Sequence, residues 1–155
     1  MCGIVGYIGA RSAQDVLLAG LKKLEYRGYD SCGIATVENG SLNVLKTINR
    51  IDGLLVDAKN LEKASIGIGH TRWATHGGVT KENAHPHLSN NEKIVVVHNG
   101  IIENYITLRN MLKSKGYTFY SETDTEVIPN LISMHYEGDI LSCSDSGSDS
   151  GSAWA

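Results

Sequence analysis

The chain opens with Met1-Cys2-Gly3-Ile4-Val5-Gly6, so removal of the initiator methionine would make Cys2 the first residue. Cys2 would then carry a thiol and a free α-amine in one residue, on adjacent carbons. A thiol is nucleophilic as its thiolate, and an α-amine, with an ordinary pKa of about 7.7 to 8.0, can serve as the base. Alternatively, Cys2 only begins a buried strand, because free cysteine is commonly buried and the residues that follow are mostly apolar. The rest of the chain decides between these two interpretations.

The composition is that of an ordinary globular domain. Of the 155 residues, 41% are hydrophobic and 20% are charged. The formal net charge of -3 gives no basic excess, so no nucleic-acid partner is expected. No apolar run approaches the roughly 20 residues that span a bilayer, and no secretory signal is present, so we expect a cytoplasmic protein without membrane contact. Cys2, Cys32 and Cys143 lack the spacing of a zinc site or a disulfide framework, which agrees with a reducing compartment.

Apolar periodicity predicts that strands and helices alternate along most of the chain. A strand over residues 2–8 is followed by a helix over residues 13–24, where apolar residues recur at helical spacing. Asn39-Gly40 predicts a two-residue hairpin between strands at residues 33–37 and 42–48. The further expected elements are a helix at residues 53–62, a strand at 66–70, a polar functional loop at 72–93, a strand at 94–98 and a helix at 103–115.

The last part of the sequence combines a helix with a tail. Thr123 and Glu126 form a capping-box pattern for a helix that runs to about Tyr136. Pro129 should kink this helix or move its start to a later residue. Residues 140–155 are rich in Ser, Asp and Gly and have no apolar periodicity, so we expect a disordered tail after a domain at residues 2–139.

Five segments stand out because they hold a cysteine, arginines, histidines, an Asn-Gly pair and acidic residues. They are Cys2-Gly3-Ile4-Val5-Gly6, Leu24-Glu25-Tyr26-Arg27-Gly28-Tyr29-Asp30-Ser31, Gly69-His70-Thr71-Arg72-Trp73-Ala74-Thr75-His76-Gly77, His98-Asn99-Gly100-Ile101-Ile102-Glu103-Asn104 and Ser121-Glu122-Thr123-Asp124-Thr125-Glu126. In order and approximate spacing they resemble the class II glutamine amidotransferases, and among these the glutaminase domain of the glutamine:fructose-6-phosphate aminotransferases. The resemblance extends from residue 2 to about residue 133.

The resemblance implies a fold class and how much of the family's domain this chain contains. Class II amidotransferases are N-terminal nucleophile hydrolases, so the implied fold is α+β, a four-layer αββα sandwich. The glutaminase domain of this family continues well beyond residue 139, whereas the match here gives way to the Ser-rich tail. We therefore expect a partial amidotransferase domain, an incomplete sandwich, and possible self-association through uncovered strand edges.

The resemblance also implies a catalytic set. Cys2 attacks the side-chain amide of glutamine and forms a thioester, the Asn99 amide and the Gly100 backbone N–H bind the oxyanion, and Arg27 orients the catalytic amine. From the residues alone, Asn99-Gly100 could instead be the type I′ turn of a hairpin. Arg27 could equally form an ion pair with Glu25 or Asp30.

The substrate-binding set follows from the same resemblance. Arg72 is implied to bind the α-carboxylate of glutamine, for which a guanidinium is suited, and Asp124 its α-ammonium. Trp73, Thr75 and His76 belong to the surrounding loop. The alternatives are a surface salt bridge for Arg72, core packing for Trp73 and a helix N-terminal acid for Asp124.

Other functions find less support in the sequence. His85-Pro86-His87 lacks the spacing of the usual two-histidine metal sites, and no phosphate-binding loop occurs, so neither a metal nor a cofactor is expected. In the family, ammonia reaches an isomerase domain that aminates fructose 6-phosphate for glucosamine 6-phosphate synthesis, and this chain has no room for that domain. The alternatives are an inactive or glutamine-binding fragment that complements another chain, and a glutaminase like that of amidophosphoribosyltransferase.

Overall fold

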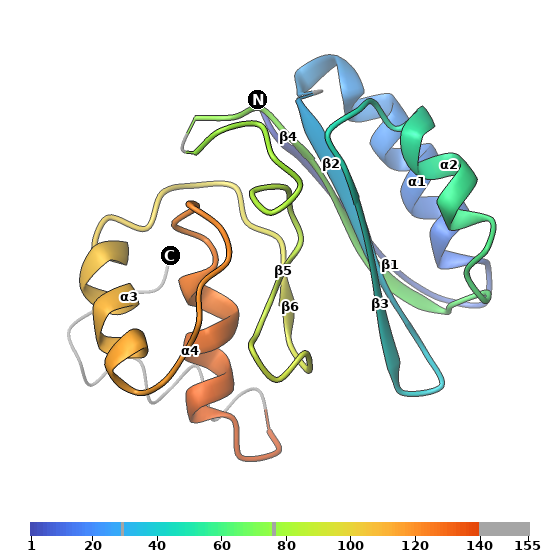
Figure 1. Ribbon diagram of the computed structural model, residues 1–155. Coiled ribbons are helices and arrows are strands. Elements are labelled where there is room, and N and C mark those ends of the chain that lie inside the picture. Colours follow the sequence, from blue (N-terminus) through green and yellow to red (C-terminus); the bar gives the residue numbers. More distant parts are fainter. Residues whose placement is uncertain (29, 76, 140–155) are drawn as a thin grey trace.

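Four antiparallel strands form the central sheet, in the order β1-β4-β2-β3 (Figure 1). The structure is a computed structural model that describes residues 1–28, 30–75 and 77–139. The strands are β1 (Gly3–Ile8), β2 (Ser31–Glu38), β3 (Ser41–Thr47) and β4 (Ile66–Arg72). Gly3 pairs with Thr71 across β1 and β4, and Ser31 pairs with Arg72 across β2 and β4. This register places the start of the chain beside the end of β4.

The hairpin predicted at Asn39-Gly40 is confirmed. Both residues have positive φ, 49° for Asn39 and 77° for Gly40, as a type I′ turn requires. Glycine adopts this conformation without steric cost, and asparagine tolerates it better than most residues. The turn joins β2 and β3 with Glu38 opposite Ser41.

Two helices cover one face of the central sheet: α1 (Ala13–Leu24) and α2 (Asp52–Ala58) (Figure 1). The bounds of α1 are those predicted from its periodicity. Leu17 and Leu21 are fully buried, and a Cβ at Gly67 or Gly69 would lie 2.7 or 2.8 Å from their side chains. Glycine in β4 therefore lets the helix approach the sheet closely.

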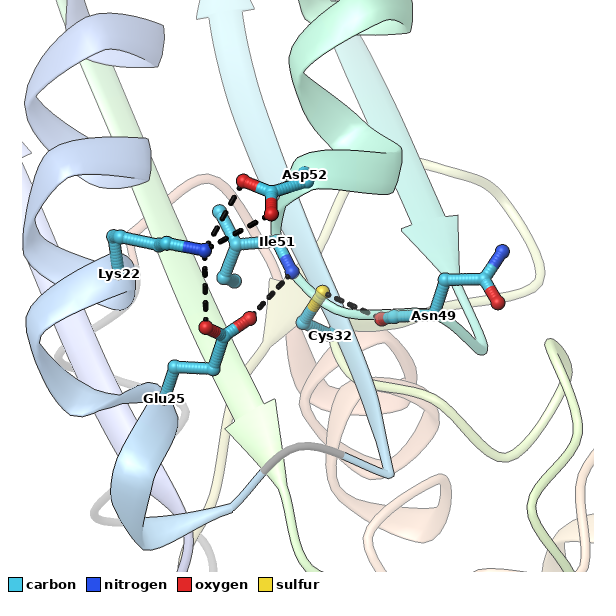
Figure 2. Close-up of polar contacts among 6 residues, drawn as sticks. All are labelled: Lys22, Glu25, Cys32, Asn49, Ile51 and Asp52. Atoms are coloured by element: carbon cyan, nitrogen blue, oxygen red, sulfur yellow. Dashed lines mark hydrogen bonds and ion pairs between the residues drawn. The ribbon is translucent and has the colours of Figure 1, made fainter.

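A polar cluster joins the end of α1 to the start of α2 (Figure 2). The carboxylate of Glu25, in the short helix η1 (Glu25–Arg27), accepts a hydrogen bond from the Ile51 backbone N–H at 3.0 Å and pairs with Lys22 at 3.1 Å. Lys22 also contacts Asp52 at 3.0 Å. Glu25 is 8% exposed, so these partners offset the cost of burying its charge.

A second, smaller sheet lies on the opposite face and carries an outer helical layer (Figure 1). Its strands, β5 (His87–Leu88) and β6 (Val95–Val96), are two residues long each. The outer helices are α3 (Tyr105–Ser114) and α4 (Val127–His135), and α4 packs on both short strands. The predicted strand over residues 94–98 is thus shorter, and β5 lies inside the segment that was expected to be a loop.

The capping box predicted at Thr123 and Glu126 is wrong. The Glu126 carboxylate accepts hydrogen bonds from the backbone N–H groups of Tyr120 and Ser121, at 2.9 and 2.8 Å, instead of capping Thr123. The helix begins at Val127, so Pro129 falls in its first turn, where a missing N–H costs no helical hydrogen bond. The later start expected from Pro129 is confirmed.

The layers follow the order helices, central sheet, second sheet, helices (Figure 1). The fold is therefore α+β, with the arrangement of an incomplete αββα sandwich. No helix within the described residues has the length and apolarity needed to cross a membrane. The expected tail at residues 140–155 lies outside the described residues.

Candidate active site

A cavity of about 630 Å³ opens between the end of β4 and the segments that precede α3 and α4. It brings together the residues that the sequence singled out, with one exception. His76 lies outside the described residues. The predicted site residues that line the cavity are Cys2, Arg27, Arg72, Trp73, Thr75, Asn99, Gly100 and Asp124.

The Cys2 sulfur is held at the rim of this cavity by the chain just after β4. It accepts a hydrogen bond from the Trp73 backbone N–H at 3.3 Å and lies 3.7 Å from the Trp73 carbonyl oxygen. The Gly3 backbone N–H donates to the Thr71 hydroxyl at 3.1 Å. Cys2 is half-buried, so its thiol is fixed in position and still accessible, unlike that of a cysteine that only begins a buried strand.

Asn99 links Cys2 to His70, a residue of strand β4 in the central sheet. Its Nδ2 donates to the Cys2 carbonyl oxygen at 3.3 Å, and its Oδ1 lies 2.8 Å from His70 Nε2. The hairpin alternative for Asn99-Gly100 is wrong, since Gly100 has φ of 157° and Asn99 is not among the described non-glycine residues with positive φ. Both residues line the cavity, so their donors are available to a bound group there.

Arg72 is the last residue of β4 and is 4% exposed. Its guanidinium donates to the backbone oxygens of Gly78 and Gly77, at 3.0 and 3.5 Å. Burial lowers the pKa of Arg72, and the nearby acidic groups, among them Asp124, oppose that shift. A surface salt bridge is therefore not its role, and the buried cation favours an anionic partner in the cavity.

Asp124 lies across the cavity in the segment before α4. Its Oδ2 accepts from the Ile102 backbone N–H at 2.7 Å, and its Oδ1 accepts from that of Thr125 at 2.9 Å. The first turn of α4 contains no acidic residue, so Asp124 is not the helix N-terminal acid of the alternative interpretation. At 6% exposure it places a fixed negative charge at the cavity wall.

The loop after Arg72 is tied down by a pair of residues that sequence reasoning missed. The Asn83 amide donates to the Glu122 carboxylate at 3.0 Å and accepts from the Glu122 backbone N–H at 2.8 Å. The same carboxylate accepts from the Gly78 backbone N–H at 3.2 Å, and these hydrogen bonds lower the pKa of Glu122.

Trp73, in this loop, is 44% exposed, so core packing is not its role.

Arg27 lies beside the start of the chain. Its carbonyl oxygen accepts a hydrogen bond from the Met1 amine, and its guanidinium lies 3.6 Å from the Met1 sulfur. Glu25 is engaged by Lys22 and Ile51 instead, and Asp30 accepts from the Ala74 backbone N–H at 2.9 Å. The ion-pair alternatives for Arg27 are therefore not what the structure shows.

Three buried histidines cluster at the cavity wall, and two of them, His70 and His85, line the cavity. His70 and His85 stack with ring centroids 4.1 Å apart, and His87 meets His85 edge-on at 4.6 Å. Burial lowers the pKa of His70 to about 4 and also lowers the pKa values of His85 and His87. Within the described part of the chain, no group of three or more His, Cys, Asp or Glu residues is placed to hold a metal ion.

A family model described as a glutamine amidotransferase domain matches residues 32–141. The chain belongs to this family. The amidotransferase domain is also similar to curated relatives named glutamine–fructose-6-phosphate aminotransferase (isomerizing). That of Clostridium perfringens is 58% identical over 144 residues, or 91% of this chain, and that of Synechocystis sp. is 59% identical over 133 residues, or 85%. The amidotransferase domain spans 23% of the length of the first of these relatives and 21% of the second.

Two solved structures have a similar fold. A glutamine phosphoribosylpyrophosphate amidotransferase from B. subtilis superposes with a TM-score of 0.79 at 26% identity. A structure titled as the allosteric regulatory enzyme of purine biosynthesis gives 0.81 at 27% identity. Each covers 96% of this chain and 33% of its own. The amidotransferase domain thus has the fold of the N-terminal nucleophile hydrolases.

Proposed function

We propose that the 630 Å³ cavity is a glutamine site at which the side-chain amide is hydrolysed through a thioester on Cys2. One observation carries the proposal: an accessible cysteine sulfur shares a cavity with a buried arginine and a buried aspartate. These are Cys2, Arg72 and Asp124. An α-amino acid offers the complementary carboxylate and ammonium at one end and an amide at the other.

Recognition of glutamine rests on both charges. The planar guanidinium of Arg72 suits a two-point contact with the α-carboxylate, and the carboxylate of Asp124 pairs with the α-ammonium. Both protein groups are already held by backbone hydrogen bonds, so little ordering is left to occur on binding. Thr75 and Trp73 line the same cavity and would surround the ligand, and His76 is proposed to join them.

The reaction begins when the Cys2 thiol passes its proton to the Cys2 α-amine and the sulfur attacks the amide carbon. The carbonyl oxygen becomes negative, and Asn99 Nδ2 and the Gly100 N–H donate to it. The C–N bond then breaks as the Cys2 α-amine, freed by removal of Met1 and oriented by Arg27, passes a proton to the departing ammonia. Water attacks the thioester in turn, which releases glutamate and restores the thiol. No cofactor is needed for these steps.

The fate of the ammonia is proposed from the relatives. Their name states that they act on fructose 6-phosphate, and this chain spans 23% of the length of the C. perfringens protein. We propose that the ammonia serves the synthesis of glucosamine 6-phosphate from fructose 6-phosphate, a step for which other residues of such a protein are needed.

The location is proposed to be cytoplasmic, where thiols stay reduced. Strands β1 and β3 are the edges of the central sheet, so self-association there is proposed as well.

A glutaminase that serves amidophosphoribosyl transfer is the second candidate. The fold similarity to phosphoribosylpyrophosphate amidotransferase supports it, but the identity is 26%. The two fructose-6-phosphate enzymes described above are 58% and 59% identical over 91% and 85% of the chain. The sequence therefore favours the amino-sugar function.

The test is glutamate release from glutamine, together with the intact mass of the purified chain. The assay uses both this chain and a chain extended by the residues that follow the matched region in the C. perfringens relative. We expect Met1 to be absent, and hydrolysis by the extended chain to be abolished by Cys2→Ala but retained in Cys32→Ala. Calorimetry with glutamine detects binding in a chain that does not hydrolyse it, and so distinguishes a glutamine-binding fragment from an enzyme. If neither chain shows Cys2-dependent hydrolysis, the proposal is wrong.

A further inference from the structure

We propose that His70 is a positioning residue that determines which end of the Asn99 amide faces the reacting carbonyl. The inference rests on the glutaminase function proposed above. His70 lies in β4 and is 1% exposed, and its Nε2 is 2.8 Å from Asn99 Oδ1. His70 also lines the cavity, but its Nε2 is already engaged by Asn99. Its effect on chemistry would therefore pass through Asn99.

The hydrogen bonds of Asn99 fix the direction of the amide. Its Nδ2 donates to the Cys2 carbonyl oxygen at 3.3 Å, so the donor end lies on the side of the nucleophile. Its Oδ1 faces His70 and can only accept, so His70 Nε2 must carry the proton. With the proton on Nδ1 instead, two lone pairs would face each other. The amide would then turn over and place an oxygen, not a donor, beside the developing oxyanion.

The surroundings of His70 favour the Nε2–H tautomer. Its Nδ1 is buried and makes no hydrogen bond to the described residues, so a proton there would be an unsatisfied buried donor, which is costly. The ring is neutral, because burial lowers its pKa to about 4 although contacts with the Asn99 side chain and the His98 backbone act in the opposite direction. A neutral ring with one proton gives the amide a single allowed direction.

Packing holds the ring in place. His70 pairs with Gly33 in β2, and a Cβ at Gly33 would clash with the His85 carbonyl oxygen. The missing side chain lets His85 stack on His70, with the rings inclined by 18°. His85 Nδ1 in turn accepts from the His98 backbone N–H at 3.4 Å, one residue before Asn99. Two stacked rings thus support the segment that carries the proposed oxyanion donors.

The first experiment reads the tautomer without catalysis. Nitrogen-15 NMR of the histidine rings in the 155-residue chain should show His70 as the neutral Nε2–H form between about pH 6 and 8, and the Asn99→Ala variant should weaken that preference. The Nδ1–H form as the main species would overturn the inference, whether or not the chain hydrolyses glutamine.

The second experiment is a double-mutant cycle in whichever chain, native or extended, shows Cys2-dependent hydrolysis. Loss of an oxyanion donor typically lowers kcat by about 100- to 1000-fold. We expect His70→Leu to lower kcat by about tenfold or more with little change in KM, and His70→Gln, which keeps an amide N–H donor, to recover part of the loss. In the Asn99→Ala background His70→Leu should change kcat by less than about threefold.

The outcomes separate this inference from the proposed function. Hydrolysis that does not depend on Cys2 overturns both. Hydrolysis that depends on Cys2, with His70→Leu equally harmful in the native and Asn99→Ala backgrounds, overturns only the role of His70. If His70→Leu fails to fold, the comparison uses His70→Gln and His70→Asn. His70→Asn lacks a donor at the Nε2 position, so it should lower kcat more than His70→Gln, and equal effects of the two would contradict the inference.

Discussion

The sulfur of Cys2 lies 3.3 Å from the backbone nitrogen of Trp73. This contact follows from the register of β1 and β4, which pairs Gly3 with Thr71. Arg72 lies between Thr71 and Trp73 in the sequence, so one strand pairing positions both the proposed nucleophile and the proposed carboxylate-binding residue. Backbone pairing therefore fixes where the Cys2 sulfur lies relative to Arg72, as the proposed glutamine site requires.

A glutamine-analogue diazo-ketone should label Cys2 and spare Cys32. Cys32 is 2% exposed, and burial, with a contribution from Glu25, raises its pKa to about 12, so its thiolate is scarce near neutral pH. Its sulfur lies 3.4 Å from the Asn49 carbonyl oxygen in the interior (Figure 2). Peptide mass mapping checks this, with Cys2→Ala as the control. Equal labelling of Cys2, Cys32 and Cys143 would contradict the assignment of Cys2.

Replacement of Arg72 by lysine should raise the KM for glutamine by about tenfold or more, although the charge is kept. An ammonium group cannot make the two parallel hydrogen bonds that a guanidinium offers a carboxylate. A tenfold loss corresponds to about 1.4 kcal/mol. Steady-state kinetics in the active chain measure the effect, and Arg11→Lys, at an exposed position, is the matched control. An unchanged KM would mean that Arg72 does not bind the α-carboxylate.

Asp124→Asn should weaken glutamine binding at the other charged group. The substitution removes the negative charge that would lie opposite the α-ammonium. Asp124 now accepts hydrogen bonds from the backbone N–H groups of Ile102 and Thr125. The amide nitrogen of asparagine would face one of these donors and could not accept its hydrogen bond. We expect a rise in KM of about tenfold together with a lower melting temperature. Asp57→Asn, an exposed position, should change neither. A change in melting temperature with the same KM would leave Asp124 a purely structural residue.

Local patterns predicted the parts of the fold that local interactions create. The helix α1 has its predicted bounds because its apolar spacing is long and regular, and Asn39-Gly40 forms its turn because of its own backbone preferences. The capping box failed because Glu126 bonds to Ser121 and Tyr120, which lie before Thr123 and therefore outside the four-residue pattern.

The candidate site was predicted in its members but not in its supports. The segments that resemble known amidotransferases contain the cavity-lining residues except Met1 and His85. The link between His70 and Asn99 crosses 29 positions, and that between Asn83 and Glu122 crosses 39. No spacing rule connects residues so far apart in one sequence, so these partners are visible only once the sheets are packed.

Stability should fall as the pH is lowered from about 6.5 toward 4. The pKa of His70 is lowered to about 4 by burial, and burial also lowers those of His85 and His87, with the charges of Arg72 and Lys46 acting in the same direction on both. In this window the unfolded chain binds protons that the folded chain does not. Each histidine that stays neutral should therefore cost about 1.4 kcal/mol of unfolding free energy per pH unit.

Urea denaturation at a series of pH values between about 7 and 5 measures this slope. His85→Phe keeps a ring for stacking but removes one titrating group, so its slope should be smaller by about one proton. Its stability at neutral pH serves as the reference for any packing loss. A native slope near zero would show that the three rings are already protonated or exposed in the folded chain.

Extension of the chain should increase both cooperativity and activity. The second sheet has two strands of two residues each within the described residues, and a sheet of two short strands is marginally stable alone. Asn99 and Gly100 follow closely after β6, which ends at Val96, so the geometry of the proposed oxyanion donors depends on that sheet. Catalytic groups that are all present still give little rate if they are held loosely.

The 155-residue chain should therefore show little or no hydrolysis of glutamine and a broad thermal transition. Replacing residues 142–155 by the residues that follow the matched region in the C. perfringens relative should sharpen the transition and produce glutaminase activity, because added strands would brace β6. Calorimetry and glutamate release measure the two effects, and the extended chain with Cys2→Ala controls for background hydrolysis. Robust hydrolysis by the unextended chain that is lost in Cys2→Ala would refute this prediction, since the short second sheet would then hold the donors well enough by itself.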